Sequence, residues 1–217
     1  MAVLIRWVTF DCYGTLIDWE RGITEALLPL LRVRVERDEL ARRYIATEAK
    51  VEAESYRRYR DVLDEAGRRL LASFGSDAPS PLAASLATWR PFAEVPGALA
   101  ELRRRGRKIA ILSNVDRDLI ASSLSQLGLE PDLVVTAQDC GSYKPAPGHW
   151  RMFAERSGAG PDDTIHVGAS QYHDIRAAAA LGYRTVFVDR HGEKLDTAPT
   201  RVTSDLATLR DVIDALE

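Results

Sequence analysis

The chain has 217 residues, of which 46% are hydrophobic and 28% are charged, and its formal net charge is −3 at pH 7. This charge offers no general attraction to nucleic acid, and no apolar run reaches the ~18 residues that a membrane span needs. The two cysteines are too few for a disulfide framework. We therefore expect a cytoplasmic protein that binds neither nucleic acid nor membranes.

The N-terminal segment VLIRWVTF, residues 3–10, is apolar and runs directly into Asp11. It lacks the basic region and the small-residue cleavage site of a signal peptide, so we interpret it as a buried strand. Gly14 follows in a short turn, where a glycine lets backbone amides approach a reacting group. An acid in this place could cap a helix or act as a nucleophile, and both readings remain open at this point.

Residues 19–74 are dense in Ala, Glu, Arg and Leu and contain no strand-like run. They are predicted to be mostly helical, followed by a loop at 75–83 that carries two prolines. The first strand ends at Asp11 and the next begins only at Lys108. Residues 18–90 are therefore predicted to form a helical cap, inserted into a core made of residues 1–17 and 91–217.

Short runs rich in Val, Ile and Leu recur in the second half of the chain, separated by stretches of helical length that end in glycine. The predicted strands lie at 108–113, 132–137, 164–169 and 184–189, and the predicted helices at 96–106, 117–128, 147–158 and 173–182. Buried parallel strands have this apolar pattern, and glycine is suited to a helix C-cap. The alternation predicts an α/β fold with a doubly wound parallel sheet.

Polar residues follow four of the predicted strands. They are Asp11, the pair Ser113 and Asn114, then Lys144 and Asp174 in later loops. Ligands of open parallel sheets bind beyond the carboxyl ends of the strands. Each residue alone could be a cap, a turn or a solvated loop residue, but their occurrence at successive strand ends predicts one active site.

These residue types suit nucleophilic catalysis by a carboxylate. Asp11 would attack an electrophile and form an ester, and Lys144 would keep it ionised, because a nearby opposite charge favours the charged form. Asp174 could then orient or deprotonate the water that clears the ester.

Four segments, FDCYGTLID, ILSN, YKPAP and HVGASQYHDI, resemble the four motifs of the haloacid dehalogenase superfamily, in order and over essentially the whole chain. Most members are magnesium-dependent phosphatases, with a second acid two residues after the nucleophile and another after the glycine of the fourth motif. Here these positions are Tyr13 and Ala169. Tyrosine in the first motif is similar to the L-2-haloacid dehalogenase branch.

This resemblance implies that Asp11 displaces halide from C2 of a small 2-haloacid or haloacetate with inversion, and that water releases the hydroxy acid without a cofactor or metal. Thr15, Ser113 and Asn114 would hold the nucleophile or the substrate. Arg43 in the cap would bind the substrate carboxylate or the halide, and Arg42, Arg57 and Arg60 remain alternatives.

The remaining residues that the resemblance assigns to the substrate pocket are Cys12, Tyr13, Asn114, Trp150, Gln171 and His173. The chain departs from the branch at Ala169 and Gln171, where serine and asparagine are usual, and at Trp150, where tyrosine is usual. His173 could assist the water or be merely hydrogen-bonded.

Two other functions stay open. One is a phosphatase of the same superfamily, with Mg²⁺ held by Asp11, a backbone carbonyl and Asp174. The other is a degenerate member that binds a small anion or a partner protein. The apolar faces of the insertion could form a homodimer or pack on the core.

Overall fold

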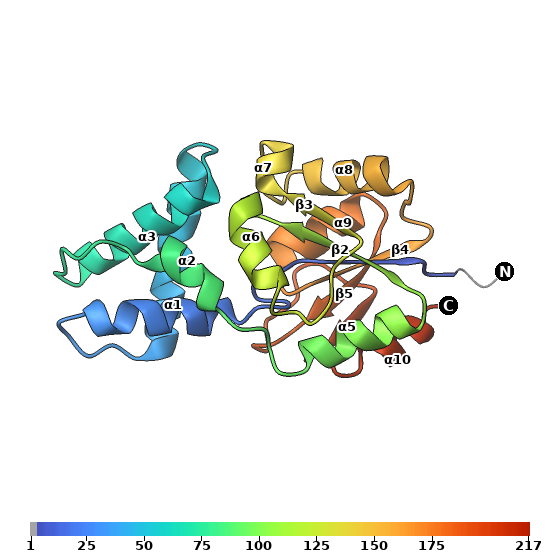
Figure 1. Cartoon of the computed structure of the whole chain (residues 1–217), viewed down its shortest axis with the longest axis horizontal. Helices are drawn as coiled ribbons and strands as arrows, with labels where there is room; N and C mark the ends of the chain where they lie inside the picture. Colours follow the sequence, from blue (N-terminus) through green and yellow to red (C-terminus); the bar gives the residue numbers. More distant parts are fainter. Residues whose placement is uncertain (1–3) are drawn as a thin grey trace.

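The computed structural model describes residues 4–217, and its core is a six-stranded parallel sheet with the strand order β3-β2-β1-β4-β5-β6. The strands are β1 (Trp7–Phe10), β2 (Lys108–Ser113), β3 (Leu133–Thr136), β4 (Thr164–Gly168), β5 (Arg184–Val188) and β6 (Arg201–Thr203). Helices cover both faces (Figure 1), which confirms the predicted doubly wound α/β fold. The sequence pattern did not predict β6.

The helices fall into two groups along the chain. Those between β1 and β2 are α1 (Trp19–Leu27), η1 (Leu28–Leu30), α2 (Arg37–Glu54), α3 (Tyr59–Ser73), α4 (Leu82–Ser85), η2 (Leu86–Thr88) and α5 (Val95–Arg104). Those after β2 are α6 (Arg117–Leu124), α7 (Ala137–Cys140), α8 (Gly148–Ser157), η3 (Gln171–Ile175), α9 (Arg176–Ala180) and α10 (Leu209–Asp214). η3 is a short π-helix that follows the carboxyl end of β4. None of the helices in residues 4–217 is long and apolar enough to cross a membrane.

The sheet separates two apolar layers. On one face α8 and α9 pack on the strands through Trp150, Phe153 and Ala178. On the other face α5 and α10 pack through Leu99 and Ile213, and Figure 1 shows them below the sheet. Strands β1 and β4 lie in the middle and are fully buried, which explains their continuous apolar sequences.

The helices from α1 to η2 form a separate lobe, drawn at the left of Figure 1 and joined to the core by two chain segments. Helices α2 and α3 pack against each other, and Tyr44, Leu63 and Leu70 are buried in this lobe. The lobe packs tightly near the joint: a Cβ on Gly22 would lie 2.3 Å from the Trp89 ring, so the close approach of α1 requires glycine. We call this lobe the cap.

Candidate active site

Asp11 leaves β1 at its carboxyl end, where its backbone N–H donates to the Val167 carbonyl of β4. Its carboxylate accepts a hydrogen bond from the Thr15 hydroxyl at 2.9 Å. The Thr15 hydroxyl in turn accepts one from the Ala169 backbone N–H at 2.9 Å. Gly14 makes the intervening turn with a φ of 97°, a conformation that favours glycine. The first and fourth motifs are thus tied together around the Asp11 side chain.

Lys144 lies between two carboxylates. Its ammonium donates to Asp11 at 2.8 Å and to Asp174 at 2.6 Å, and its side chain is 1% exposed. The Asn114 side chain holds the Lys144 backbone, accepting from its N–H at 2.6 Å and donating to its carbonyl at 3.2 Å. Residues that are far apart in the sequence therefore fix the position of one buried cation.

The charges of this group depend on one another. Burial opposes ionisation of Lys144, but Asp11 and Asp174 outweigh it and raise the pKa of Lys144 above its usual range. Burial also opposes ionisation of Asp174, yet Lys144 and His166 hold its pKa well below the ordinary value. The pKa of Asp11 is raised by burial and by the Asp174 charge, against the attraction of Lys144. Asp174 and Lys144 thus form a permanent ion pair, and Asp11 is the member whose protonation changes more easily.

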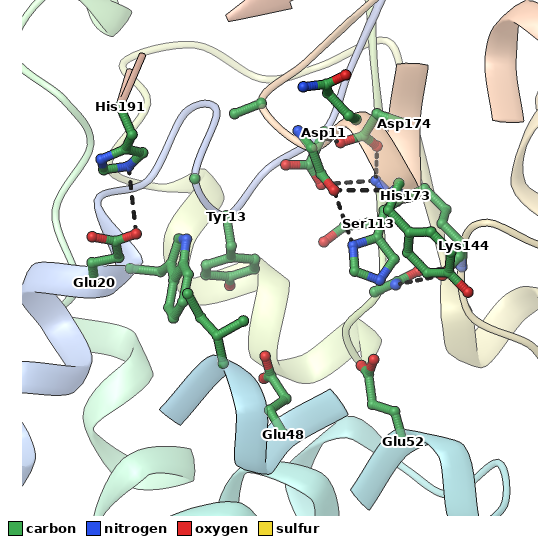
Figure 2. Close-up of a pocket in the computed structure, with 18 of the residues that line it drawn as sticks. Asp11, Tyr13, Glu20, Glu48, Glu52, Ser113, Lys144, His173, Asp174 and His191 are labelled. Atoms are coloured by element: carbon green, nitrogen blue, oxygen red, sulfur yellow. Dashed lines mark hydrogen bonds and ion pairs between the residues drawn. The ribbon is translucent and has the colours of Figure 1, made fainter. Parts of the chain in front are cut away.

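A cavity of about 470 Å³ opens in front of Asp11, between the core and the cap. Figure 2 shows Asp11, Ser113, Lys144, His173 and Asp174 on the core side, with Glu48 and Glu52 below them on the cap helix α2. Of the predicted site residues, those that line this cavity are Asp11, Tyr13, Ser113, Asn114, Lys144, Gln171, His173 and Asp174. Thr15 is buried behind Asp11 and acts on it through the hydrogen bond given above.

Tyr13 occupies the position where the phosphatases of the superfamily carry their second acid. Its hydroxyl is bonded to the Ser123 hydroxyl at 2.8 Å, and its ring meets the edge of Trp89 with centroids 6.0 Å apart. Burial raises the pKa of Tyr13 well above its ordinary value, so the phenol stays protonated. The Tyr13 ring therefore lines the cavity as an apolar surface, and the position provides no carboxylate.

The turn after β4 contributes His173 and Gln171. Nδ1 of His173 lies 3.2 Å from the Ser170 hydroxyl, and burial together with the Lys144 charge lowers the pKa of His173. Its imidazole is therefore neutral at pH 7. The Gln171 amide donates to the Lys194 carbonyl at 2.9 Å and accepts from the Asp196 N–H at 2.7 Å, which fixes the loop at one side of the cavity.

Two predicted substrate contacts lie outside the cavity. Cys12 is fully buried in the core, because neighbouring residues of an extended segment point in opposite directions and Asp11 faces the cavity. Trp150 lies on the inner face of α8 and packs on His166, with ring centroids 5.2 Å apart. Both side chains support the fold, and neither borders the space that a substrate would occupy.

None of the predicted cap arginines lines the cavity. Arg43 lies over the Phe74 ring, 4.6 Å from its centroid, and pairs with Glu39 at 3.4 Å on the outer surface of α2. Arg42 is exposed. Arg57 pairs with Glu54, and Arg60 pairs with Asp118. The expected arginine contact to a substrate carboxylate or a halide is therefore corrected: α2 turns a different face to the cavity.

The face that α2 turns to the cavity carries Ile45, Glu48 and Glu52. Sequence reasoning missed these residues, although their spacing of three and four is that of one helix face. The signal was present in the stretch IATEAKVE, but nothing in the sequence alone fixes how far the helix is rotated.

The two carboxylates that would hold a magnesium ion already pair with another cation. The Lys144 ammonium fills the space between Asp11 and Asp174, the two acids that would bind the metal, and Ala169 supplies no third carboxylate. Among residues 4–217, no group of three or more His, Cys, Asp or Glu side chains is placed to hold a metal ion. Mg²⁺ is usually held by one or two carboxylates together with waters and substrate phosphate, and both candidate carboxylates of this site already pair with the Lys144 ammonium.

Fold and site define a class of protein: a doubly wound α/β enzyme with an acid at the end of its first strand and a buried lysine beside it. The model of the haloacid dehalogenase-like hydrolase family matches residues 5–182. The chain belongs to this family, which confirms the predicted superfamily and the prediction of a hydrolase.

Known proteins similar to this chain include dehalogenases and phosphatases. The chain is 25% identical to the (S)-2-haloacid dehalogenase of Pseudomonas sp. (strain YL), over 98% of this chain and 95% of that protein. It is 32% identical to the ribulose-1,5-bisphosphate 5-phosphatase of Halopiger xanaduensis, over 68% of this chain and 69% of that protein. Other curated relatives match over about half of their own length.

A solved structure has the same fold over the whole chain. It is the L-2-haloacid dehalogenase from Xanthobacter autotrophicus with chloropropionic acid covalently bound. The TM-score is 0.86, with 99% of this chain and 100% of that chain covered at 19% identity. This likeness establishes the shared fold, and the chemistry has to be argued from the residues of the cavity.

Proposed function

We propose that the protein hydrolyses the carbon–halogen bond of a small organic halide through an ester of Asp11, without a metal ion. The observation that carries the proposal is the Lys144 ammonium, held at 2.8 Å from Asp11 and 2.6 Å from Asp174. It keeps a buried carboxylate ionised where a metal would otherwise be needed. The 2-haloacids in the names of the dehalogenase relatives are the first substrates to test.

In the first step, a carboxylate oxygen of Asp11 attacks the carbon that bears the halogen. A carbon–oxygen bond forms, the carbon–halogen bond breaks, and the halide leaves with the bonding electrons. Attack on the side opposite the halogen inverts the configuration at that carbon. Halide needs no proton to leave, so this reaction does not require the second acid that the phosphatases carry. Tyr13 at that position is therefore compatible with the proposed first step.

In the second step, water attacks the ester carbonyl of Asp11. We assign the proton of this water to His173, whose neutral imidazole borders the cavity, and which returns it to the departing alkoxide. The carbonyl–alkoxide bond breaks, the alcohol leaves, and the regenerated Asp11 releases one proton. The net reaction consumes one water and gives an alcohol, halide and a proton. Asp174 is fully buried and accepts a hydrogen bond from the Lys144 ammonium, so we assign it the role of holding that lysine and not of deprotonating the water.

Phosphate transfer is the alternative that the phosphatase relative raises. It would require Mg²⁺ at Asp11 and Asp174, and both of these carboxylates already pair with the Lys144 ammonium. It would also require a group that protonates the leaving alcohol.

One paired assay tests this function. The protein is incubated in EDTA with L-2-chloropropionate, with bromoacetate and with 2-bromoethylammonium, and free halide is measured against enzyme-free blanks. A second reaction contains p-nitrophenyl phosphate and MgCl₂. Halide release that EDTA does not change supports the proposal. Phosphate release that depends on Mg²⁺, with no halide release from any of the three halides, contradicts it.

A further inference from the structure

The cap side of the cavity carries two carboxylates, and their surroundings resemble a binding site for a cation. Oε1 of Glu48 accepts hydrogen bonds from the Tyr44 hydroxyl at 3.0 Å and the Tyr59 hydroxyl at 2.5 Å. Within residues 4–217 its other oxygen has no hydrogen-bond partner, and Glu52 has neither a hydrogen bond nor an ion pair there. Figure 2 shows both side chains projecting from α2 toward the core side of the cavity.

The other acids that border the cavity differ from this pair. Asp11 and Asp174 share Lys144, Glu20 lies 3.4 Å from His191, Asp196 pairs with Arg176, and Glu193 is exposed to solvent. Glu48 and Glu52 are half-buried, and among the described residues no cation balances them. Ionisation of both half-buried carboxylates is unfavourable unless a group of opposite charge joins them, and without it one of them takes up a proton.

Burial and mutual repulsion act on both groups. Burial and the Glu48 charge raise the pKa of Glu52 to about 8. Burial raises the pKa of Glu48 as well, against the two tyrosine hydroxyls that stabilise its charged form. A cation bound between them would favour ionisation of both, because an opposite charge stabilises the charged form.

Two further features of the cavity point to a ligand, and the first of them points to a cation. Trp19, Tyr59 and Trp89 line it, and aromatic faces attract alkylammonium groups. Ser113, on the core side, is 1% exposed, and its hydroxyl has no hydrogen-bond partner in the described part of the chain. A ligand that fills the cavity would supply that partner. Among the described residues no arginine lines the cavity, and its two lysines are Lys144, which pairs with Asp11 and Asp174, and Lys194 in the exposed loop.

We propose that Glu48 and Glu52 bind a cationic group of the substrate, an alkylammonium or guanidinium, while Asp11 attacks a carbon at the other end of the same molecule. This inference rests on the proposed function for the reaction but concerns recognition. It makes the substrate a cation-bearing halide in place of a haloacid.

The binding test uses ligands that cannot react. Propylammonium and propionate are titrated calorimetrically into the whole protein, into Glu52→Gln, into Glu48→Gln/Glu52→Gln, and into the control Glu39→Gln. Glu39 lies on the same helix but is exposed and outside the cavity. We expect propylammonium to bind more tightly than propionate, with a loss of roughly tenfold in Glu52→Gln, a larger loss in the double variant and none in the control. Tighter binding of propionate, or unchanged binding of propylammonium in the double variant, would overturn the inference.

The pH dependence provides a readout that a merely structural role would not change. The titratable groups around the pair are Tyr44 on α2, Tyr59 on α3, Tyr143 before Lys144, and Lys144 and His173 across the cavity. The pKa values of the tyrosines and of Lys144 are raised and that of His173 is lowered, so these groups keep their charge between pH 7 and 9. Propylammonium affinity should therefore rise through about pH 8 as Glu52 ionises, and this rise should be absent in Glu52→Gln.

Halide release separates the inference from the function on which it rests. Bromide release from 2-bromoethylammonium and from bromoacetate is compared, with an expected preference of kcat/KM for the cation that Glu52→Gln reduces. Preference for bromoacetate would overturn the cation site and leave the dehalogenase standing. Absence of bromide release from every halide, with propylammonium binding intact and sensitive to Glu52→Gln, would overturn the reaction and leave the cation site standing.

Discussion

Replacement of Lys144 by methionine tests the electrostatic account in depth. Methionine has a similar length and no charge, so Lys144→Met leaves Asp11 and Asp174 facing each other with no cation between them. Removing one partner from a buried charged group costs about 3–5 kcal/mol, which is a large part of the 5–15 kcal/mol that stabilises a typical domain. We expect a folded but strongly destabilised protein with no measurable turnover at pH 7.

The size of the loss should depend on pH. In the wild type the pKa of Asp174 is lowered by folding, so the ion pair stabilises the native state above the unfolded pKa of about 3.9 and loses this effect in acid. In Lys144→Met the folded pKa values of both acids lie above about 3.9, because burial and repulsion are no longer opposed. The folded variant then takes up protons more readily than the unfolded chain. Its deficit shrinks by about 1.4 kcal/mol for each pH unit below the raised pKa.

Urea unfolding at pH 8 and pH 5 measures this effect. The wild type, Lys144→Met and the control Lys50→Met are compared; Lys50 is an exposed residue of α2, and its replacement should change stability by less than about 0.5 kcal/mol. The expected deficit of Lys144→Met is larger at pH 8 than at pH 5. An equal deficit at both pH values, or a loss below about 1 kcal/mol, would refute the reasoning that Lys144 balances two buried carboxylates.

Three variants and one pH profile test single parts of the site. Asp11→Asn should reduce halide release by on the order of 10⁴-fold while the melting temperature stays within a few degrees, and substantial residual turnover would remove Asp11 from its role. In the wild type, kcat/KM should fall in acid at a pH above about 3.9, because burial and Asp174 raise the pKa of Asp11, and a limb at or below that value would contradict this. His173→Asn should slow the second step by about 10²–10⁴-fold, so that mass spectrometry of the quenched enzyme detects the ester; rapid turnover with no ester would assign the proton elsewhere. Gly168→Ala places a Cβ 2.6 Å from that of Asp174, so we expect a loss of about 1–3 kcal/mol in urea unfolding and slower turnover, and wild-type values would contradict the tight packing.

The parts of the fold that the sequence predicts are those in which local pattern and burial agree. Strands β1, β2, β4 and β5 are continuous apolar runs because helices cover both faces of the sheet. β6 escaped prediction because it has three residues and two of them are exposed, so its pairing with β5 leaves no apolar signature. The boundaries 17/18 and 90/91 between core and cap remain predictions.

The break between α2 and α3 illustrates a contact that local pattern cannot reveal. The sequence predicts mostly helix across residues 39–75, but α2 ends at Glu54 and the next residues are extended. Tyr56 in this break packs on Tyr143, with ring centroids 5.2 Å apart, and its hydroxyl donates to the Ala137 carbonyl at 3.1 Å. These partners come from the core, so the break depends on how the cap meets it.

The core residues of the candidate site could be predicted from the sequence, and the cap residues could not. Asp11, Lys144 and Asp174 could be predicted because strand ends in a parallel sheet converge on one edge, whatever the cap does. The cap contribution could not be predicted, because it depends on the rotation of α2. That rotation sends Arg43 outward to Phe74 and turns Glu48 to the cavity.

The central claim is that the oxygen transferred to the substrate comes from Asp11, with no metal involved. The direct measurement is a single turnover in H₂¹⁸O and EDTA, with enzyme in excess over a halide that releases bromide in the assay above. The account predicts that the product alcohol contains ¹⁶O and that the peptide with Asp11 gains ¹⁸O when water opens the ester. Product alcohol labelled with ¹⁸O, together with an unlabelled Asp11 peptide, would show that water attacks the carbon directly and would contradict the account.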